Sequence, residues 1–243
     1  MRGKDVENHG GSPSATATCP WFRCFARRRR LTPGTRAAIM ASFHGQEAVG
    51  VADAWEDLER ECGGCHACQL GERRQHLVFG DGNRNAEIMF IGEGPGQRED
   101  EQGLPFVGPA GQLLNDMMEL IGLDRSKVYI ANIVKCRPPG NRDPLNTEQQ
   151  ACLPWLRRQT ALLRPKMIVC LGRIAAQVII KPDFRITREH GQWFQRAGVW
   201  LTAIYHPSAL LRDVYKRPET FVDLKAIQAK AREVCARTDI PTP

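Results

Sequence analysis

Four short and almost entirely apolar runs alternate along the chain with longer stretches that have helical spacing. They run from Glu87 to Gly92, from Lys127 to Val134, from Lys166 to Leu171 and from Val199 to Ile204. Apolar runs without polar alternation are typical of strands covered on both faces, and strands separated by helices usually form a parallel sheet. The sequence therefore predicts an α/β fold, a three-layer α/β/α sandwich with a central four-stranded parallel sheet.

The helices of this fold are predicted from apolar periodicity and from the residue types at helix ends. They cover residues 48–62, 108–122 and 147–165, with two more after Gly172 and from about Pro218. In open parallel sheets, ligands bind beyond the carboxyl ends of the strands. The segments that directly follow the strands are therefore the candidate site.

The positive charge of the chain is concentrated at its N-terminus. Of a net charge of +7, six units lie in residues 1–45, where eight Lys or Arg residues stand against two acids. This segment is rich in Gly, Ser, Thr and Pro and has no helical or strand periodicity. We expect a disordered extension over 1–45, one domain over 46–237 and a flexible tail over 238–243. For the extension, we favour a true start at Met40 over an organelle-targeting peptide.

The rest of the chain carries a net charge of only +1, so a basic groove for nucleic acid has to come from local arrangement. No apolar stretch reaches the length of a membrane span, and no secretory signal precedes the run of arginines from Arg27 to Arg30. We therefore expect a cytoplasmic protein with no membrane partner. We also expect it to be a monomer. Nine cysteines, an odd number, in a chain without a secretory signal argue against disulfides.

Five cysteines fall into two groups that suit a metal centre. Cys62, Cys65 and Cys68 are equally spaced in "CGGCHACQL", and Cys136 and Cys152 flank a proline-rich segment far along the chain. Zinc and iron-sulfur centres both accept four thiolates, so the residue types leave the metal and the ligand set open. Alternatively, Cys136 and Cys152 are small core residues and only the first three cysteines bind metal. The other cysteines, expected to be inert, are Cys19, Cys24, Cys170 and Cys235.

The glycine-rich segment "IGEGPGQREDEQGLPFVG", residues 91–108, follows the first predicted strand. A phosphate-binding loop would end in Lys-Ser or Lys-Thr, but this segment places Glu93 among its glycines and continues with further acids. We therefore expect no nucleotide cofactor. Two other predicted strands are followed by "NIVKCRPPGNRDP" and "YHPSALLR", and we expect the three segments to converge on one site.

The order of five motifs between Glu61 and Lys230 closely resembles that of the family 4 uracil-DNA glycosylases. The motifs are C-x-x-C-x-L, GEGPG, GLPFVGPAGQLL, NIVKCRPPGNRDP and YHPSALLR. The resemblance implies a uracil-DNA glycosylase-like fold and an iron-sulfur enzyme that acts on uracil-containing DNA. It also implies a ligand set for one 4Fe-4S cluster, namely Cys65, Cys68, Cys136 and Cys152. Cys62 is then a spare thiol, although its equal spacing leaves a slipped ligand set open.

The resemblance implies roles for the remaining residues of the motifs. Cleavage of the bond between deoxyribose and uracil passes through an oxocarbenium-like sugar and a departing uracil anion. Glu93 and His206 are the expected catalytic residues, with Glu93 near the sugar and its attacking water and His206 donating to uracil O2. The expected uracil-binding residues are Gly94, Gly96, Glu99, Phe106 and Asn132. The expected DNA-binding residues are Ser208, Leu210, Leu211 and Arg212.

Within these sets, Phe106 is expected to stack on the flipped base, Asn132 to read the uracil edge and Glu99 to lie near C5 of the base. The two leucines are expected to form an apolar wedge into the base stack. Taken singly, Phe106, Asn132 and His206 have plain structural explanations as a core ring, a turn cap and a structural histidine. Their joint placement at strand ends favours the functional interpretation.

We expect a monofunctional hydrolase that leaves an abasic site and starts base-excision repair, because no lysine is placed to form a Schiff base. The alternative is a non-catalytic DNA-binding or polymerase-associated module that keeps the fold and the cluster. The intact Glu93, Asn132 and His206 count against that alternative. Pro109 and His190 stand where many relatives have basic residues, which takes away one candidate phosphate contact at Pro109.

Overall fold

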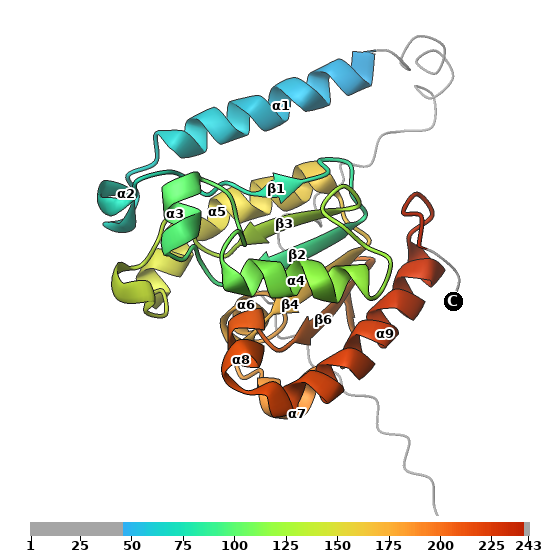
Figure 1. Ribbon diagram of the computed structural model, residues 1–243. Helices are drawn as coiled ribbons and strands as arrows, with labels where there is room; N and C mark the ends of the chain where they lie inside the picture. Colours follow the sequence, from blue (N-terminus) through green and yellow to red (C-terminus); the bar gives the residue numbers. More distant parts are fainter. Residues whose placement is uncertain (1–45, 241–243) are drawn as a thin grey trace, which may run out of the picture.

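The computed structural model describes residues 46–240, and it contains one six-stranded sheet with the order β1-β3-β2-β4-β6-β5 (Figure 1). The inner strands are β2 (Ile88–Gly92), β3 (Val128–Asn132), β4 (Met167–Leu171) and β6 (Val199–Ile204). They pair in parallel, so that Phe90 aligns with Ile130 on one side and with Val169 on the other. The predicted α/β fold and its four-stranded parallel core are confirmed.

The sheet also has two short edge strands that the sequence analysis missed, so it is mixed and not purely parallel. β1 (Asp81–Gly82) pairs antiparallel with β3, and β5 (Phe194–Arg196) pairs antiparallel with β6. Neither strand is apolar enough to stand out, because each lies at an edge and keeps partial contact with solvent. The sheet therefore has six strands, two more than the four that were expected.

Helices cover both faces of the sheet and form the outer layers of the sandwich (Figure 1). The longer helices are α1 (Gln46–Gly63), α4 (Pro109–Glu119), α5 (Asn146–Leu163), α6 (Arg173–Ile179) and α9 (Arg217–Val234). Each corresponds to a helix expected from the sequence. The shorter helical segments are α2 (Leu70–Arg73), α3 (Gln97–Gln102), η3 (Pro139–Asn141), α7 (Ile186–Glu189), α8 (Pro207–Arg212) and η4 (Val214–Lys216).

The core is divided by the sheet into two apolar clusters, because successive strand residues point to opposite faces. Met89 and Ile91 of β2 pack in the cluster beneath α1, α5 and α6. Ile88 and Phe90 pack in the cluster beneath α4, α8 and α9. Every residue of β2, β3 and β4 is buried, which explains why these strands read as continuous apolar runs.

The ends of the chain bear on the expected domain limits. The expected extension over 1–45 lies outside the described residues, and so does the end of the expected tail. Ile240, at the end of the described chain, is 9% exposed and belongs to the second apolar cluster. Of the helices in the described part, none has the length and apolar character needed to span a bilayer.

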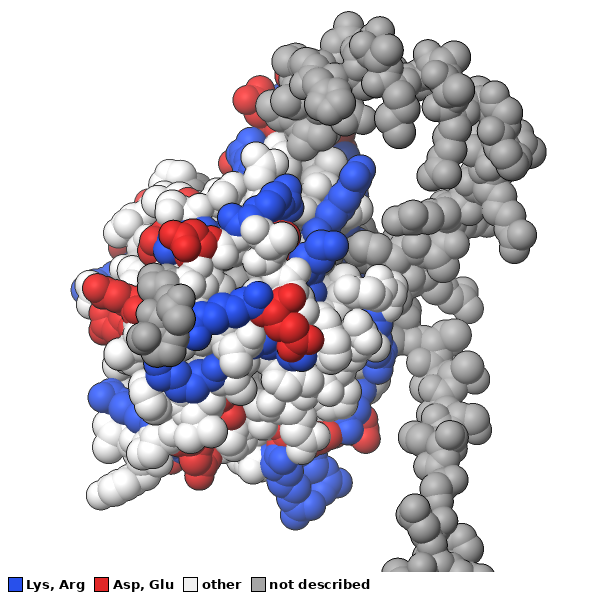
Figure 2. Space-filling view, turned by 90° about the vertical axis from the view of Figure 1, so that its right-hand side faces the viewer, with Lys and Arg blue, Asp and Glu red and all other residues white. Residues whose placement is uncertain are grey.

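Charged side chains are mixed in sign on the face shown in Figure 2, which is the right-hand side of the molecule in Figure 1. Lys and Arg side chains on this face alternate with Asp and Glu, in line with the small net charge of the chain after residue 45. This face lies at the end of the sheet away from α3, which follows the carboxyl end of β2.

Candidate active site

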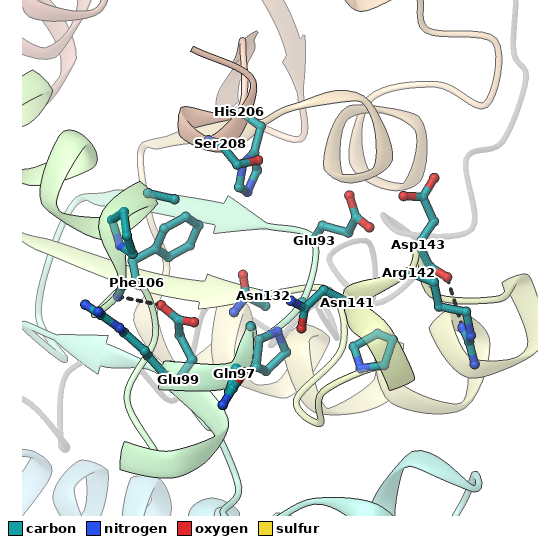
Figure 3. A pocket seen from close by; sticks show the side chains of 18 of the residues that line it. Glu93, Gln97, Glu99, Phe106, Asn132, Asn141, Arg142, Asp143, His206 and Ser208 are labelled. Atoms are coloured by element: carbon teal, nitrogen blue, oxygen red, sulfur yellow. Dashed lines mark hydrogen bonds between the residues drawn. The ribbon is translucent and has the colours of Figure 1, made fainter. Parts of the chain in front are cut away.

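One cavity of about 640 Å³ lies beyond the carboxyl ends of β2, β3 and β6. Its walls come from the segments that follow these strands, together with α3 and the start of α4 (Figure 3). The expected site residues that line it are Glu93, Gly94, Gly96, Glu99, Phe106, Asn132, His206, Ser208 and Arg212. The three segments therefore converge as the sequence analysis expected, while the roles of their residues remain predictions.

Glu93 directly follows β2, and its half-buried carboxyl group lies beside that of Asp143 (Figure 3). Burial, followed by the charge of Asp143 and a hydrogen bond with it, raises the pKa of Glu93 to about 7. Arg173 opposes this shift, and its guanidinium forms an ion pair with Asp143 at 2.6 Å. Carboxyl groups that share a site do not both ionise readily, so this pair retains a proton close to neutral pH.

Asn132 ends β3, and its side chain forms the floor of the cavity together with the ring of Phe106. Asn132 is 1% exposed, and its Oδ1 has no hydrogen-bond partner in the described structure. Gly92 makes room for both side chains, since a Cβ there would lie 2.4 Å from Asn132 Oδ1 and 2.6 Å from Phe106 Cζ. A buried acceptor without a partner is costly, so this amide is set to receive a donor from a ligand.

His206 precedes α8 and places its ring beside Phe106, with the two ring centroids 5.7 Å apart. The backbone N–H of Ser208 donates to Nδ1 of His206 at 3.1 Å, and the Ser208 hydroxyl lies 2.8 Å from the same nitrogen. Burial, and then the charge of Arg212, lowers the pKa of His206 to about 4. The imidazole is therefore neutral near pH 7, and because Nδ1 accepts, its proton sits on Nε2.

The backbone around His206 explains one glycine of the sequence. Gly172 follows β4 with a φ of +87°, and a Cβ at this position would lie 2.8 Å from Cβ of His206. Any other residue would strain the backbone and push against the histidine. The close approach of β4 to α8 at the carboxyl edge of the sheet thus fixes where the imidazole lies.

Glu99 lies in α3 and contacts the segment that carries Phe106. Its Oε1 accepts hydrogen bonds from the backbone N–H groups of Val107, at 2.9 Å, and Gly108, at 2.8 Å. Its Oε2 lies against Gly96, where a Cβ would come within 2.7 Å. The carboxylate therefore fastens the Phe106 segment to the start of the glycine-rich loop, and its expected role near C5 of the base stays a prediction.

The expected DNA-contacting residues separate into two groups. Ser208 and Arg212 line the cavity. Leu211 is 42% exposed, but Leu210, its neighbour in α8, is 1% exposed and packs in the core beneath α8. Adjacent residues of a helix point in different directions, so the expected apolar wedge of two leucines is reduced to Leu211 alone.

Several residues line the cavity that the sequence analysis did not assign to it. They are Pro95, Gln97, Arg98, Glu101, Gly108, Pro109, Ala110, Pro138, Asn141, Arg142 and Asp143. Asn141, Arg142 and Asp143 belong to the motif "NIVKCRPPGNRDP", which was the available signal. Arg142 also donates two hydrogen bonds to the Glu148 carboxylate, at 2.9 and 2.6 Å. The positive charge of Arg142 is therefore largely neutralised within the protein.

The five cysteines of the two groups surround a second, small cavity at the side of the molecule where α2, α5 and the segment after β3 meet. They are Cys62, Cys65, Cys68, Cys136 and Cys152. Within the described chain, no three His, Cys, Asp or Glu residues are close enough to hold a single metal ion. A 4Fe-4S cluster spreads its thiolates around a cube and not around one ion, so this finding does not conflict with cluster ligation.

The polar groups around this second cavity suit negatively charged thiolates. Arg74 Nη1 donates to Cys136 Sγ at 3.3 Å, Trp155 Nε1 donates to Cys65 Sγ at 3.3 Å, and the Lys135 backbone N–H donates to Cys152 Sγ at 3.2 Å. The Lys135 side chain lines the cavity and is 1% exposed. Hydrogen bonds to the cysteine sulfurs are a usual feature of iron-sulfur centres, so these residues fit the group.

The last residue of β3 and the segment that follows it contribute to both cavities. Lys135 Nζ donates to the backbone carbonyl of Asn132 at 3.0 Å, while its backbone contacts the Cys152 thiol. Asn132 in turn forms the floor of the first cavity. The group of five cysteines therefore contacts the segment that supports the buried side chain of Asn132.

Comparison with known proteins agrees with this geometry. The family model of the Uracil DNA glycosylase superfamily matches residues 79–227, which include every residue that lines the larger cavity. A type-4 uracil-DNA glycosylase of Archaeoglobus fulgidus is 44% identical over 193 residues, covering 76% of this chain and 95% of the relative. The chain belongs to the type-4 uracil-DNA glycosylases of this superfamily.

Other members of the type-4 family are similarly close. The type-4 uracil-DNA glycosylase of Sulfurisphaera tokodaii is 42% identical over 188 residues, covering 74% of this chain and 86% of the relative. That of Saccharolobus solfataricus is 51% identical over 156 residues, covering 60% of this chain and 72% of the relative. The resemblance inferred from five motifs is thereby confirmed at the level of the family.

Proposed function

We propose that the protein is a DNA repair enzyme that removes uracil from single- or double-stranded DNA by hydrolysing the N-glycosidic bond, which leaves an abasic site. The observation that carries the proposal is the arrangement of four groups around one cavity. They are a carboxyl group, an unpartnered buried amide, an aromatic ring and a neutral imidazole, supplied by Glu93, Asn132, Phe106 and His206. Membership of the type-4 family supports the same reaction.

Base recognition is assigned to the floor of the cavity. A uracil that is flipped out of the stack would lie against the Phe106 ring with its edge toward Asn132. Asn132 Oδ1, buried and without a partner, accepts from uracil N3–H, and the amide NH₂ donates to O4. Gly94 and Gly96 line the cavity, and a side chain would fit at neither position, because a Cβ would lie 2.7 Å from Val134 Cγ2 or from Glu99 Oε2. We assign their backbone to contact with the base.

Bond cleavage places negative charge on the leaving uracil and positive charge on the sugar. The Nε2–H group of His206 donates a hydrogen bond to uracil O2 as negative charge builds there. The ring is neutral and its Nδ1 accepts from Ser208, so Nε2 carries the proton that this hydrogen bond needs. Glu93 in its carboxylate form stabilises the sugar and orients the water that attacks it. No lysine lines the cavity within the described chain, so strand cleavage through a Schiff base is not proposed.

DNA is held at the mouth of the cavity by Ser208 and Arg212 from α8, with Leu211 filling the space that the flipped base leaves. Arg98 from α3 also lines the cavity and adds a second cation. The cytoplasmic location and the monomeric state remain predictions from the sequence.

We assign a 4Fe-4S cluster to the thiols of Cys65, Cys68, Cys136 and Cys152, which line one cavity and receive N–H donors at three of their sulfurs. The bound cluster would supply covalent cross-links between the first cysteine loop, the end of β3 and α5. Cys62 lines the same cavity and is 1% exposed, so it is either the spare thiol or a replacement ligand.

The function is tested by incubating the purified protein with an oligonucleotide that contains one uracil and then treating the DNA with alkali. Strand breakage at the uracil after alkali, and an intact strand before it, is the expected result. Breakage without alkali would contradict the monofunctional reaction. An intact strand after alkali, from protein that is folded, would favour a non-catalytic DNA-binding module.

The Glu93 and Asp143 pair makes the reaction dependent on pH. The reaction needs the Glu93 carboxylate, whose pKa is raised to about 7, so the single-turnover rate should rise as pH increases through that value. Asp143→Asn removes the charge and hydrogen bond that raise this pKa, so the rising limb should move to lower pH. Burial, the largest cause, remains and keeps the pKa above its ordinary value.

The measurement is the single-turnover rate of uracil excision for the wild type and Asp143→Asn, over a range from roughly pH 5 to pH 9 that is centred near neutral pH. The matched control is Asp183→Asn, which changes an exposed carboxylate that does not line the cavity. An identical midpoint for the wild type and Asp143→Asn would contradict the coupling of the two carboxyl groups.

A further inference from the structure

Phe106, the ring at the floor of the larger cavity, has a backbone conformation that residues other than glycine rarely adopt. Its φ is 55°, in the left-handed region, and its side chain is 6% exposed. Such a conformation is strained and persists only where the surroundings fix it. The contacts that fix Phe106 therefore decide where the ring lies.

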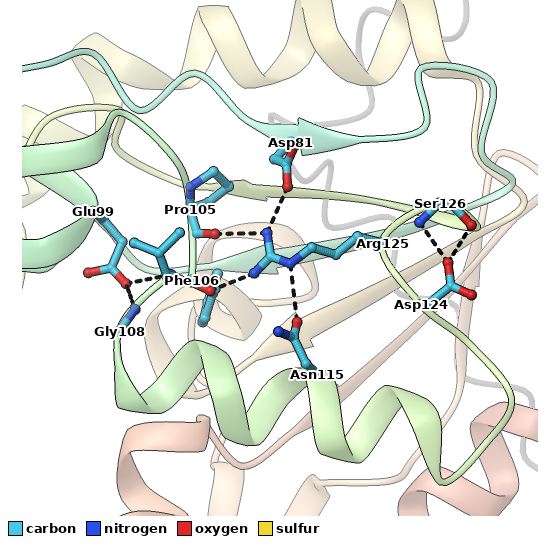
Figure 4. A network of polar contacts seen from close by, with 10 residues as sticks. Asp81, Glu99, Pro105, Phe106, Gly108, Asn115, Asp124, Arg125 and Ser126 are labelled. Carbon is cyan, nitrogen blue, oxygen red and sulfur yellow. Dashed lines mark hydrogen bonds and ion pairs between the residues drawn. The ribbon is translucent and has the colours of Figure 1, made fainter.

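A single arginine outside the cavity, Arg125, donates hydrogen bonds to two carbonyl groups of this segment (Figure 4). Arg125 Nη1 donates to the carbonyl of Pro105 at 3.1 Å, and its Nη2 donates to the carbonyl of Phe106. The same guanidinium is also held by two side chains, since Nη1 donates to Asp81 Oδ2 at 2.7 Å and Nε donates to Asn115 Oδ1 at 3.1 Å. All three of its nitrogens are thus engaged.

The anchors of Arg125 come from elements that are far apart in the chain. Asp81 belongs to the edge strand β1, Asn115 lies in α4, and Arg125 itself lies between α4 and β3. The arginine therefore ties the Pro105–Phe106 backbone to the rigid body of the domain. A planar fork with five N–H groups can meet these four acceptors together, whereas a lysine ammonium, which donates from one point, cannot.

Two further contacts restrain the Phe106 segment, one at the Phe106 carbonyl and one at the two residues that follow it. Gly111 of α4 packs against it so closely that a Cβ there would lie 1.8 Å from the Phe106 oxygen. On the cavity side, the Glu99 carboxylate holds the next two backbone N–H groups, those of Val107 and Gly108. The segment is therefore clamped on both sides, by Glu99 from the cavity and by Arg125 from the outside.

We infer that Arg125 is a positioning residue of the uracil pocket, which acts through the backbone of Phe106 and touches neither the base nor the DNA. This inference rests on the proposed function, because the ring is held where a flipped uracil would stack. Without the guanidinium, one side of this clamp is lost, and the ring is held less firmly in its place between Asn132 and His206. A misplacement of about 1 Å at a reacting centre can cost on the order of 10²-fold in rate.

The test compares Arg125→Lys and Arg125→Met with the wild type. The matched control is Arg84→Lys, which alters another arginine that joins two elements, through a 2.6 Å ion pair with Glu59, but does not contact the Phe106 segment. Four quantities are measured: the single-turnover excision rate, inhibition by free uracil, affinity for a duplex with a stable abasic-site analogue, and hydrogen-deuterium exchange of residues 104–108.

Both Arg125 variants are expected to excise uracil roughly 10- to 100-fold more slowly and to be inhibited by uracil only at correspondingly higher concentrations. Affinity for the abasic-site duplex, which has no base to stack, should stay within about twofold, because phosphate contacts supply most of it. Exchange in residues 104–108 should become faster in these variants and stay at the wild-type rate in Arg84→Lys.

Unchanged uracil inhibition and unchanged exchange in both Arg125 variants would overturn the inference. So would a parallel loss of uracil inhibition and abasic-site binding, since that would show a general loss of structure. Exchange is measured without substrate, and it separates this inference from the proposed function. Faster exchange in the Arg125 variants of a protein whose wild type excises no uracil would support the clamp and reject the glycosylase.

Discussion

His206→Ala is expected to reduce the single-turnover rate of uracil excision by about 10²- to 10³-fold, the usual cost of losing one donor to a developing anion. Ser208 N–H donates to Nδ1, so the only proton of the neutral ring is on Nε2, and alanine removes that donor. The measurement uses enzyme in excess over a uracil-containing duplex. His206→Gln, whose amide can also donate, should recover part of the lost rate.

The loss should affect the chemical step and leave DNA binding intact. Affinity for an abasic-site duplex is therefore measured in parallel and is expected to change little, because it depends on phosphate contacts. His66→Ala, which removes an exposed histidine outside the cavity, serves as the matched control. A His206→Ala protein with the wild-type rate would leave the departing uracil without a stabilising group and would reject this mechanism.

The neutral state of His206 also sets the acid limit of the reaction. Its pKa is lowered to about 4 by burial and by Arg212, so the ring becomes charged only when pH falls through that value. The Glu93 carboxylate is lost at a higher pH, because its pKa is raised to about 7. Protonation of Glu93 and not of His206 should therefore limit excision on the acid side.

The parallel core was predictable because burial on both faces leaves a direct trace in the sequence. β2, β3 and β4 are buried along their whole length, so each appears as an apolar run. The edge strands β1 and β5 are short and partly exposed, and their pairing depends on neighbours that a local pattern does not reveal. Pairing along β3 and β6, not residue preference, creates them.

The site was predictable where its residues sit at strand ends and unpredictable where contacts join separate loops. Asn132 ends β3 and His206 follows β6 closely, so sheet topology alone brings them to one edge. The convergence of the segments that carry Glu93 and Asp143 was expected, but the contacts of Asp143 with Glu93 and with Arg173 depend on loop conformation, which no spacing gives. Arg125 was missed for the same reason, since its partners lie 10 to 44 residues away.

The wedge illustrates a limit of motif reasoning at the level of single residues. The motif "YHPSALLR" placed both leucines at the DNA surface, but α8 turns Leu210 into the core and leaves Leu211 exposed. Helical geometry separates neighbouring side chains by about 100°. A motif therefore locates the segment, and the local helix decides which of its side chains faces solvent.

Cys152→Ala is expected to abolish iron binding: the proposed cluster predicts roughly four iron atoms per chain for the wild type and nearly none for this variant. Cys152 lies in α5 and is 8% exposed, and its thiol accepts a hydrogen bond from the backbone N–H of Lys135, in the segment that follows β3. Loss of this ligand would remove the cross-link between α5 and β3. The measurements are iron per chain and absorbance in the blue region after anaerobic purification.

The melting temperature of Cys152→Ala should fall as well, because cluster ligation contributes to folding directly. Lys135 should add to this effect, since its side chain is 1% exposed and the negative charge of the proposed cluster would offset the cost of burying the ammonium group. The matched control is Cys62→Ala, which removes a buried thiol of the same cavity and is expected to keep its iron. Iron loss in Cys62→Ala together with full iron in Cys65→Ala would show instead that the ligand set is shifted to Cys62.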